Sequence, residues 1–156
     1  PILLVCDKDR LEEVAIRLSR VGFDNVLGHL SGGVDAWGQN TGELHIINSI
    51  SPNKFESIYS ENIEIRVVDV RKSSEYLSEH MMGAVNTPLS ILDEDSSKII
   101  MGNENYIHCA GGYRSVIACS ILMKNGKSNI TNIEGGFGAM KELNINFSDF
   151  VCPSTL

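Results

Sequence analysis

The sequence predicts an α/β fold in which a mainly parallel sheet is covered by helices on both faces. Short apolar runs of strand length alternate along the chain with stretches whose apolar residues recur at helical spacing. No hairpin signal joins two neighbouring runs, so consecutive strands are expected to lie parallel and to be connected through helices. With 156 residues, of which 42% are hydrophobic, the chain is long enough for one domain, or for one domain and a fragment of another.

Composition excludes several classes of partner. The net charge of −7, without a basic stripe, argues against nucleic-acid binding. No apolar run is long enough to cross a membrane and no signal peptide is visible, so we expect a cytoplasmic protein without a membrane partner. The four cysteines form no CxxC pair and indicate reduced thiols. The four histidines lack metal-ligand spacing, so we predict neither a metal site nor a cofactor in this chain.

One segment of the sequence occurs twice. When Cys6 is aligned with Cys109, further positions match without a gap: Ala15 with Ala118, Gly32-Gly33 with Gly135-Gly136, and Trp37 with Met140. Self-similarity of this kind indicates one structural unit used twice. We therefore predict a partial first copy in residues 1–40, a linker at 41–43 and a complete domain in 44–156.

The first copy is expected to form a short strand–helix–strand–helix segment. It begins with a buried-type strand at 2–6 and a polar loop at 7–10. An amphipathic helix follows from Leu11 to near Gly22. A second short strand is expected at 26–27, and a turn with a short helix at 30–37.

In the complete domain, strands and helices are expected to alternate throughout. The predicted strands are 46–47, 64–70, 106–108 and 129–133, and the β-branched Val67 and Val68 make the second the strongest. Helices are predicted to begin at Ser51-Pro52, at Ser74, at Ser115 and after Glu134, and one helix is expected to end within 99–101. Residues 93–97 are predicted to form a polar loop, and the tail 144–156 to be irregular.

The most informative stretch is a strand-to-helix turn. An apolar run from Tyr106 ends at Cys109, and a helical pattern takes over from Ser115, which we expect to cap the helix. Backbone amides at such a turn stabilise an anion, and so do inward-facing amides at Gly111 and Gly112, the helix dipole and the Arg114 cation. We therefore predict that the pKa of Cys109 lies below that of a free thiol. The alternative is a buried structural cysteine beside a turn.

The loop Cys109-Ala-Gly-Gly-Tyr-Arg114-Ser115 resembles the active-site loop of the rhodanese sulfurtransferases, which carry a persulfide on its first cysteine. The six residues from Cys109 to Arg114 match the rhodanese loop length, whereas the related dual-specificity phosphatases have one residue more. The stretch from His80 to Pro88 resembles the family's His-x-x-Gly-Ala segment. The resemblance implies a rhodanese-like fold, preceded by the C-terminal half of a second rhodanese-like unit.

The resemblance also implies a reaction. Sulfur would move from thiosulfate or a low-molecular-weight persulfide to a thiol or cyanide acceptor, with Cys109 as the nucleophile. The substrate would be held by the rest of the loop: Ala110, Gly111, Gly112, Tyr113, Arg114 and Ser115. Asp69 and Arg71 would brace the loop, the alternative being a surface ion pair of little effect. Two other functions stay open, a cysteine phosphatase of the dual-specificity type and a non-catalytic regulatory or docking module.

Four further residues carry expectations. In the two-domain thiosulfate and mercaptopyruvate sulfurtransferases an arginine stands where this chain has Glu75, and a carboxylate there would disfavour dianionic thiosulfate. His80 is expected to anchor its own loop. Because side chains alternate along a strand, His108 should point away from the cysteine that follows it and pack in the core. Cys119 is expected in the core.

The first copy carries a degenerate loop. Cys6 is followed by two aspartates, the glycines are lost, and Leu11 stands where Arg114 does, so a structural role for Cys6 is expected. The segment resembles rhodanese repeats downstream of a metallo-β-lactamase-fold persulfide dioxygenase in bacterial fusion proteins, which implies iron in an upstream domain of a longer parent. Because half a sheet leaves apolar strands uncovered, we predict a homodimer through residues 1–40, with packing onto the second domain as the alternative.

Overall fold

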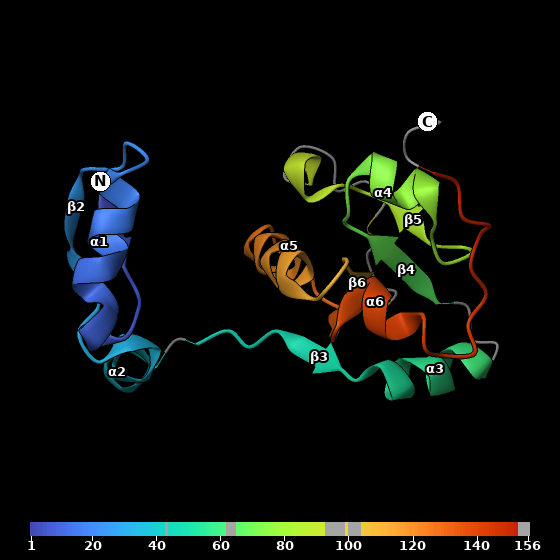
Figure 1. Ribbon diagram of the computed structural model, residues 1–156. Helices are drawn as coiled ribbons and strands as arrows, with labels where there is room; N and C mark the ends of the chain where they lie inside the picture. Colours follow the sequence, from blue (N-terminus) through green and yellow to red (C-terminus); the bar gives the residue numbers. More distant parts are fainter. Residues whose placement is uncertain (43, 62–64, 93–98, 100–103, 153–156) are drawn as a thin grey trace. The chain divides into compact units, whose positions relative to one another are not determined.

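The computed structural model describes residues 1–42, 44–61, 65–92, 99 and 104–152. The chain splits into two compact units, Pro1–Ile46 (unit 1) and Ile47–Leu156 (unit 2), and each is described by itself (Figure 1). The loop predicted at 93–97 lies outside the described residues. So do residue 43 of the predicted linker, residue 64 of a predicted strand, most of the predicted helix end at 99–101, and the end of the tail.

Unit 1 is a β–α–β–α segment. Its elements are β1 (Ile2–Leu4), the 3-10 helix η1 (Lys8–Arg10), α1 (Leu11–Ser19), β2 (Val26–His29) and α2 (Gly33–Thr41). The two strands pair in parallel, as expected for strands joined through a helix. The helix α2 runs through Thr41, which the sequence assigned to the linker. It ends there because Gly42, at φ 70°, adopts the left-handed conformation that stops helices.

Unit 1 repeats the order of elements in the second half of unit 2. Leu3 and Leu4 of β1 pair with Gly28 and His29 of β2. The alignment of Cys6 with Cys109 matches these four residues to Tyr106, Ile107, Thr131 and Asn132 of unit 2. There, too, the matching residues are partners: Tyr106 pairs with Thr131, and Ile107 pairs with Asn132. All four glycines of the two matching Gly-Gly pairs have positive φ. The internal repeat is thus a repeat of backbone geometry as well as of sequence.

Unit 2 is built on a five-stranded sheet. Its strands lie in the order β3 (Asn48–Ile50), β7 (Ile130–Ile133), β6 (Asn105–His108), β4 (Arg66–Asp69) and β5 (Val85–Asn86). Every neighbouring pair is parallel, which confirms the predicted sheet (Figure 1). The strand predicted at 46–47 is wrong, because β3 begins only at Asn48. The strand β5 was not predicted, because it is too short to leave a pattern in the sequence.

The helices of unit 2 are α3 (Pro52–Ser60), α4 (Ser73–Ser78), α5 (Tyr113–Lys124) and α6 (Gly136–Met140), with a 3-10 turn η2 (Leu89–Ile91). The helix α3 starts as predicted, because the Ser51 hydroxyl accepts the amide N–H of Lys54 at 3.3 Å. The start predicted for α5 is wrong. Its N-cap is Gly112 in the left-handed conformation, and Ser115 lies inside the helix.

Helices cover both faces of the sheet of unit 2, as predicted. Ile107 of β6 packs into a buried cluster with Ala118 and Leu122 of α5. Its neighbour Tyr106 packs into a second cluster with Phe55 of α3, the two rings lying 5.5 Å apart. Because side chains alternate across a strand, successive residues of β6 supply different faces of the sheet.

The same alternation separates Cys109 from His108. Cys109 belongs to the buried cluster on the α5 side of the sheet. The His108 ring stacks on Phe137 of α6, with centroids 6.3 Å apart, on the other side. The expectation that these two side chains point to opposite faces is therefore confirmed.

Candidate active site

Cys109 stands directly after β6, at the carboxyl edge where parallel sheets bind ligands. The amide N–H of Gly112 donates a hydrogen bond to its sulfur at 3.2 Å. The thiol in turn donates to the Ser115 hydroxyl oxygen at 3.6 Å. Only 1% of the residue is exposed, so protein groups surround the sulfur.

These contacts decide how readily Cys109 ionises. Burial raises the pKa of the thiol. Hydrogen bonds from the Ser115 hydroxyl and from the amides of Ser115, Gly112 and Gly111 outweigh burial, so the pKa of Cys109 lies below its ordinary value. This is the direction that the strand-to-helix turn predicted. The sequence placed Ser115 at the helix cap and among the residues that hold the substrate, but the contact of its hydroxyl with the Cys109 sulfur was not predicted.

Ser115 can serve both protonation states of the cysteine. With a thiol present, its hydroxyl donates to the Gly112 carbonyl oxygen at 2.9 Å and accepts the S–H of Cys109. When Cys109 is a thiolate, the same hydroxyl can turn and donate to the sulfur. The loop therefore stabilises an anion with hydrogen-bond donors of its own and needs no second titrating group.

Only one of the two loop glycines is required by the backbone. Gly112 has φ 98°, and a Cβ there would lie 3.3 Å from the Gly135 nitrogen. Gly111 has no left-handed φ, and the space at its Cβ position is open. The amides of both glycines lower the pKa of Cys109, as predicted, but only Gly112 adopts a backbone conformation that requires glycine.

Arg114 forms a bidentate ion pair with Glu75 of α4. Nη1 donates to Oε2 at 2.7 Å, and Nη2 donates to Oε1 at 2.9 Å. Glu75 also accepts the amide N–H of Lys72 at 3.2 Å. The hydrogen bond from Arg114 is the main reason that the pKa of Glu75 is lowered. The sequence treated Arg114 and Glu75 as separate charges beside the cysteine, whereas in the structure they neutralise each other.

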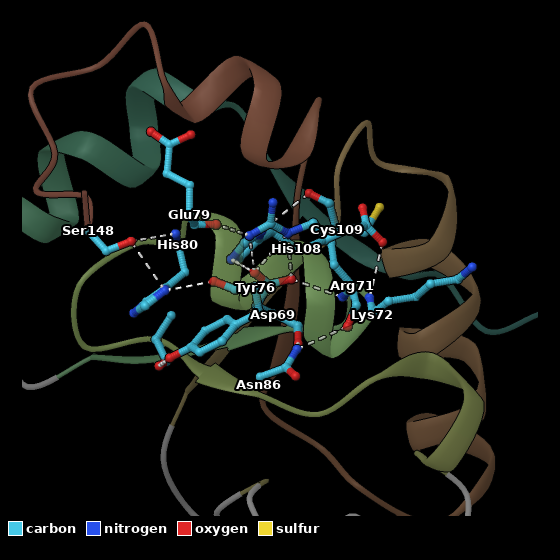
Figure 2. A network of polar contacts seen from close by, with 12 residues as sticks. Asp69, Arg71, Lys72, Tyr76, Glu79, His80, Asn86, His108, Cys109 and Ser148 are labelled. Atoms are coloured by element: carbon cyan, nitrogen blue, oxygen red, sulfur yellow. Dashed lines mark hydrogen bonds and ion pairs between the residues drawn. The ribbon is translucent and has the colours of Figure 1, made fainter. Parts of the chain in front are cut away.

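Asp69 and Arg71 form an ion pair at the end of β4 (Figure 2). The Nε and Nη2 atoms of Arg71 donate to both carboxylate oxygens at 2.7 to 3.0 Å, and its amide N–H donates to Oδ1 at 2.9 Å. Nη2 also donates to the Glu79 carbonyl oxygen at 2.8 Å. The two side chains are 0% and 6% exposed, so the alternative of a surface ion pair is wrong.

Phe137 connects this pair to the cysteine loop. The guanidinium carbon of Arg71 lies 3.9 Å from the centroid of the Phe137 ring. The amide N–H of Phe137 donates to the Cys109 carbonyl oxygen at 2.6 Å, and that of Gly138 donates to the Ala110 carbonyl oxygen at 3.0 Å. The expected bracing of the loop thus has a physical route, although the role itself stays a prediction.

The remaining residues singled out from the sequence have structural contacts. His80 anchors its own loop, because Nδ1 donates to the Tyr76 carbonyl oxygen at 2.8 Å and the backbone N–H donates to the Ser148 hydroxyl at 3.0 Å (Figure 2). Cys119 is buried in the core, and burial raises its pKa to about 12. Cys6 is half-buried in unit 1. Tyr113, in contrast, is 80% exposed at the start of α5.

The described residues contain neither a metal-binding cluster nor a membrane-spanning helix. No group of three or more His, Cys, Asp or Glu side chains in the described ranges could hold a metal ion. No helix in the part of the chain that the structure describes combines the length and the apolar character that a membrane span requires.

Known proteins resemble unit 2. The family model of the rhodanese-like domain matches residues 51–143. The uncharacterized protein YqhL of Bacillus subtilis (strain 168) is 33% identical over 95 residues, which make up 61% of this chain and 73% of YqhL. A sulfurtransferase of Allochromatium vinosum is 25% identical over 91 residues, or 58% of this chain and 85% of that protein.

Solved structures of rhodanese-like proteins also resemble this chain. A rhodanese-related protein from Thermoplasma volcanium is 27% identical, with a TM-score of 0.56 over 65% of this chain and 97% of that one. A rhodanese-like domain protein from Staphylococcus aureus is 26% identical, with a TM-score of 0.59 over 64% of this chain and 97% of that one. None of these similarities supports the predicted fusion to an upstream dioxygenase, which stays a prediction.

Proposed function

This chain belongs to the rhodanese-like domain family, and on that premise we propose that unit 2 transfers sulfane sulfur through a persulfide on Cys109. The Cys109 thiolate attacks the outer sulfur of a donor, a new S–S bond forms, and the donor leaves with the electrons of the broken bond. An acceptor thiolate, or cyanide, then attacks the outer sulfur of the persulfide and restores the Cys109 thiolate. Each step makes one bond to sulfur and breaks one, so no external oxidant or reductant is needed.

The observation that carries this proposal is the pair of polar groups around the Cys109 sulfur. The Gly112 amide donates to Sγ at 3.2 Å, and the Ser115 hydroxyl, which accepts the S–H at 3.6 Å, can turn and donate to a thiolate. A backbone amide fixed in advance stabilises an anion without reorganising during the reaction, first the attacking thiolate and then the persulfide anion. The six-residue length of the loop favours one added sulfur over a phosphate, the substrate of the alternative function.

Cys109→Ala is expected to abolish sulfur loading. The full chain is incubated with glutathione persulfide, and intact-mass spectrometry counts the sulfur atoms added. We expect one added sulfur in the native chain and none in the variant, because the Gly112 amide donates to the Cys109 sulfur and the pKa of this thiol is lowered.

Cys6→Ala is the matched control for this experiment, because Cys6 occupies the aligned position in unit 1 and should not affect loading. A mass gain that persists in Cys109→Ala would contradict the assignment of the nucleophile. A native chain that acquires no sulfur would reject sulfur transfer. Cleavage of an aryl phosphate that depends on Cys109 would favour the phosphatase alternative.

For the donor, we propose a low-molecular-weight persulfide and not thiosulfate. The support is the bidentate pair between Arg114 and Glu75, with distances of 2.7 and 2.9 Å. The cation that would attract a dianion at the end of the loop is already matched by a carboxylate. A persulfide depends less on such a cation, because the thiolate that it releases carries one negative charge on sulfur, whereas thiosulfate releases sulfite, a dianion.

Glu75→Gln is expected to raise kcat/KM for thiosulfate and to leave kcat/KM for glutathione persulfide nearly unchanged. At short range in a solvated site, two unit charges interact by about 1 kcal/mol, which corresponds to a roughly fivefold change in kcat/KM. Initial rates with the two donors test this. Glu79→Gln is the matched control, because it removes a carboxylate of the same unit that pairs with Lys141. An equal response of both variants would contradict the proposed donor preference.

We propose further that unit 1 is a partial, degenerate rhodanese-like unit. Its strand register and its left-handed Gly-Gly pair, both shared with the second half of unit 2, support this. Self-association through residues 1–40 stays a prediction. It is motivated by apolar strand residues that are uncovered within unit 1, since Leu3 is 73% exposed and Leu27 is 66% exposed.

A further inference from the structure

His108, the residue before the nucleophile, is buried in an unusual way. The whole residue is 0% exposed, yet its Nε2 atom has no hydrogen-bond partner among the described residues. Buried polar atoms are nearly always satisfied, so an unpartnered nitrogen needs an explanation. A phenylalanine would fill a similar volume and stack on Phe137 without this defect.

The other ring nitrogen makes a bond that assigns the tautomer. Nδ1 lies 3.3 Å from the Cys109 carbonyl oxygen, and because a carbonyl only accepts, Nδ1 carries the proton. Nε2 is then the bare nitrogen, 3.9 Å from Oδ2 of Asp69, too far for a hydrogen bond. Burial lowers the pKa of His108, and the nearby Asp69 only partly opposes this, which favours the neutral ring.

The groups around His108 are the ones already connected to the cysteine loop. Asp69 and Arg71 come from the end of β4 (Figure 2). Phe137 comes from α6. The Cys109 carbonyl oxygen receives two donors, the Phe137 amide at 2.6 Å and His108 Nδ1 at 3.3 Å. This carbonyl belongs to the first peptide of the loop, which leads to the Gly112 amide that faces the sulfur.

We propose that His108 is a positioning residue for Cys109: its Nδ1–H holds the Cys109 carbonyl, and so holds the loop in the conformation that aims the Gly112 amide at the sulfur. The inference rests on the proposed function, in which Cys109 is the nucleophile. It explains why a buried histidine with one unpartnered nitrogen occupies a position where an apolar residue would pack without leaving a polar atom unsatisfied. It also differs from the packing role that strand alternation alone predicted.

Two variants separate positioning from packing. His108→Phe keeps an aromatic ring against Phe137 and loses the donor. His108→Asn loses the ring and keeps an N–H at the position of Nδ1. If His108 positions the loop, the phenylalanine variant should load sulfur from glutathione persulfide roughly tenfold more slowly, as is typical when a supporting hydrogen bond is lost, and the asparagine variant should stay near the native rate.

The pH profile of Cys109 alkylation gives a readout that packing would not move. Iodoacetamide labelling of the full chain is followed across pH by mass mapping of the Cys109 peptide, with the urea-unfolded chain as the reference thiol. In His108→Phe the profile should move towards that reference, and in His108→Asn it should stay near the native one. Urea unfolding of each variant checks that it is folded, and His108→Met replaces His108→Phe if the latter is not.

The outcomes distinguish this inference from the proposed function. A native chain that takes up no sulfur would reject the proposed function, while the alkylation profiles would still test His108. A phenylalanine variant with native loading and a native profile would overturn the inference, and the proposed function would stand. Equal impairment of the phenylalanine and asparagine variants would also overturn it, because the donor would then not be the feature that matters.

Discussion

Gly136→Ala is expected to destabilise unit 2 severely. Gly136 has φ 56°, in the left-handed region, where a side chain is unfavourable by about 1–2 kcal/mol. A Cβ there would also meet backbone, namely the Cys109 carbonyl oxygen far inside contact distance, and the carbonyl carbon and oxygen of Ala110 at 3.0 Å. Overpacking of this kind typically adds about 1–3 kcal/mol.

The loop cannot easily move away from the new methyl group. The Cys109 carbonyl is held by the Phe137 amide at 2.6 Å, so a shift of the peptide would break that bond. We therefore expect Gly136→Ala to lower the free energy of unfolding by about 2–5 kcal/mol, measured by urea unfolding. Sulfur loading should fall as well, because any relaxation displaces the peptide that begins the cysteine loop.

Gly83→Ala is the matched control in the same unit. Gly83 also has a left-handed φ, at 81°, but no atom lies within 4 Å of its Cβ position. This variant should lose only the backbone contribution of about 1–2 kcal/mol and should load sulfur normally. Equal losses of stability in the two variants would show that contact with the Cys109 peptide adds nothing.

Local patterns predicted the elements of this chain well, and the reason is physical. Val67 and Val68 mark a buried strand by their side chains alone, and Ser51-Pro52 marks a helix start by its capping chemistry. The strand β5 is two residues long and leaves no period to detect. The predicted start of α5 is too late, because the first turn, Tyr113 to Ser115, carries no buried apolar residue. The helix begins instead after Gly112, whose left-handed conformation fixes its start.

The cysteine loop was visible in the sequence, but its supports were not. Glu75 and Arg114 are 39 residues apart, and a single sequence carries no signal that joins them. They meet because β4 and β6 are neighbours in the sheet, so the helices that follow these strands begin beside each other. Knowledge of the strand order would have suggested this ion pair. The strand order is set by tertiary packing, however, and cannot be read from local patterns in the sequence.

Asp69→Asn is expected to be among the most damaging isosteric changes in unit 2. The carboxylate is fully buried and accepts three hydrogen bonds from the Arg71 side chain and one from its amide. Removing the negative charge leaves a buried guanidinium uncompensated. Breaking one partner of a buried ion pair typically lowers stability by about 3–5 kcal/mol. Urea unfolding of the full chain, followed on unit 2, measures this loss.

A carboxylate that pairs with an exposed lysine supplies the control. Glu79 pairs with Lys141 at 2.7 Å, and the side chains of the two residues are 17% and 47% exposed, respectively. Because one partner of this pair is exposed to solvent, Glu79→Gln should change stability by only about 1 kcal/mol. A loss in Asp69→Asn no larger than that of Glu79→Gln would mean that Arg71 is compensated by other groups, such as the Phe137 ring and the Glu79 carbonyl oxygen.

The double variant Asp69→Asn/Arg71→Met separates charge from packing. Once the guanidinium is gone, no buried charge is left unpaired, so the double variant should be less destabilised than the sum of the two single variants. Sulfur loading should not recover in parallel, because methionine cannot reproduce the guanidinium over the Phe137 ring or its bond to the Glu79 carbonyl. Recovery of both stability and loading would show that the pair does not brace the cysteine loop. Recovery of stability alone would place the function of Arg71 in its contact with Phe137, whose amide holds the Cys109 carbonyl.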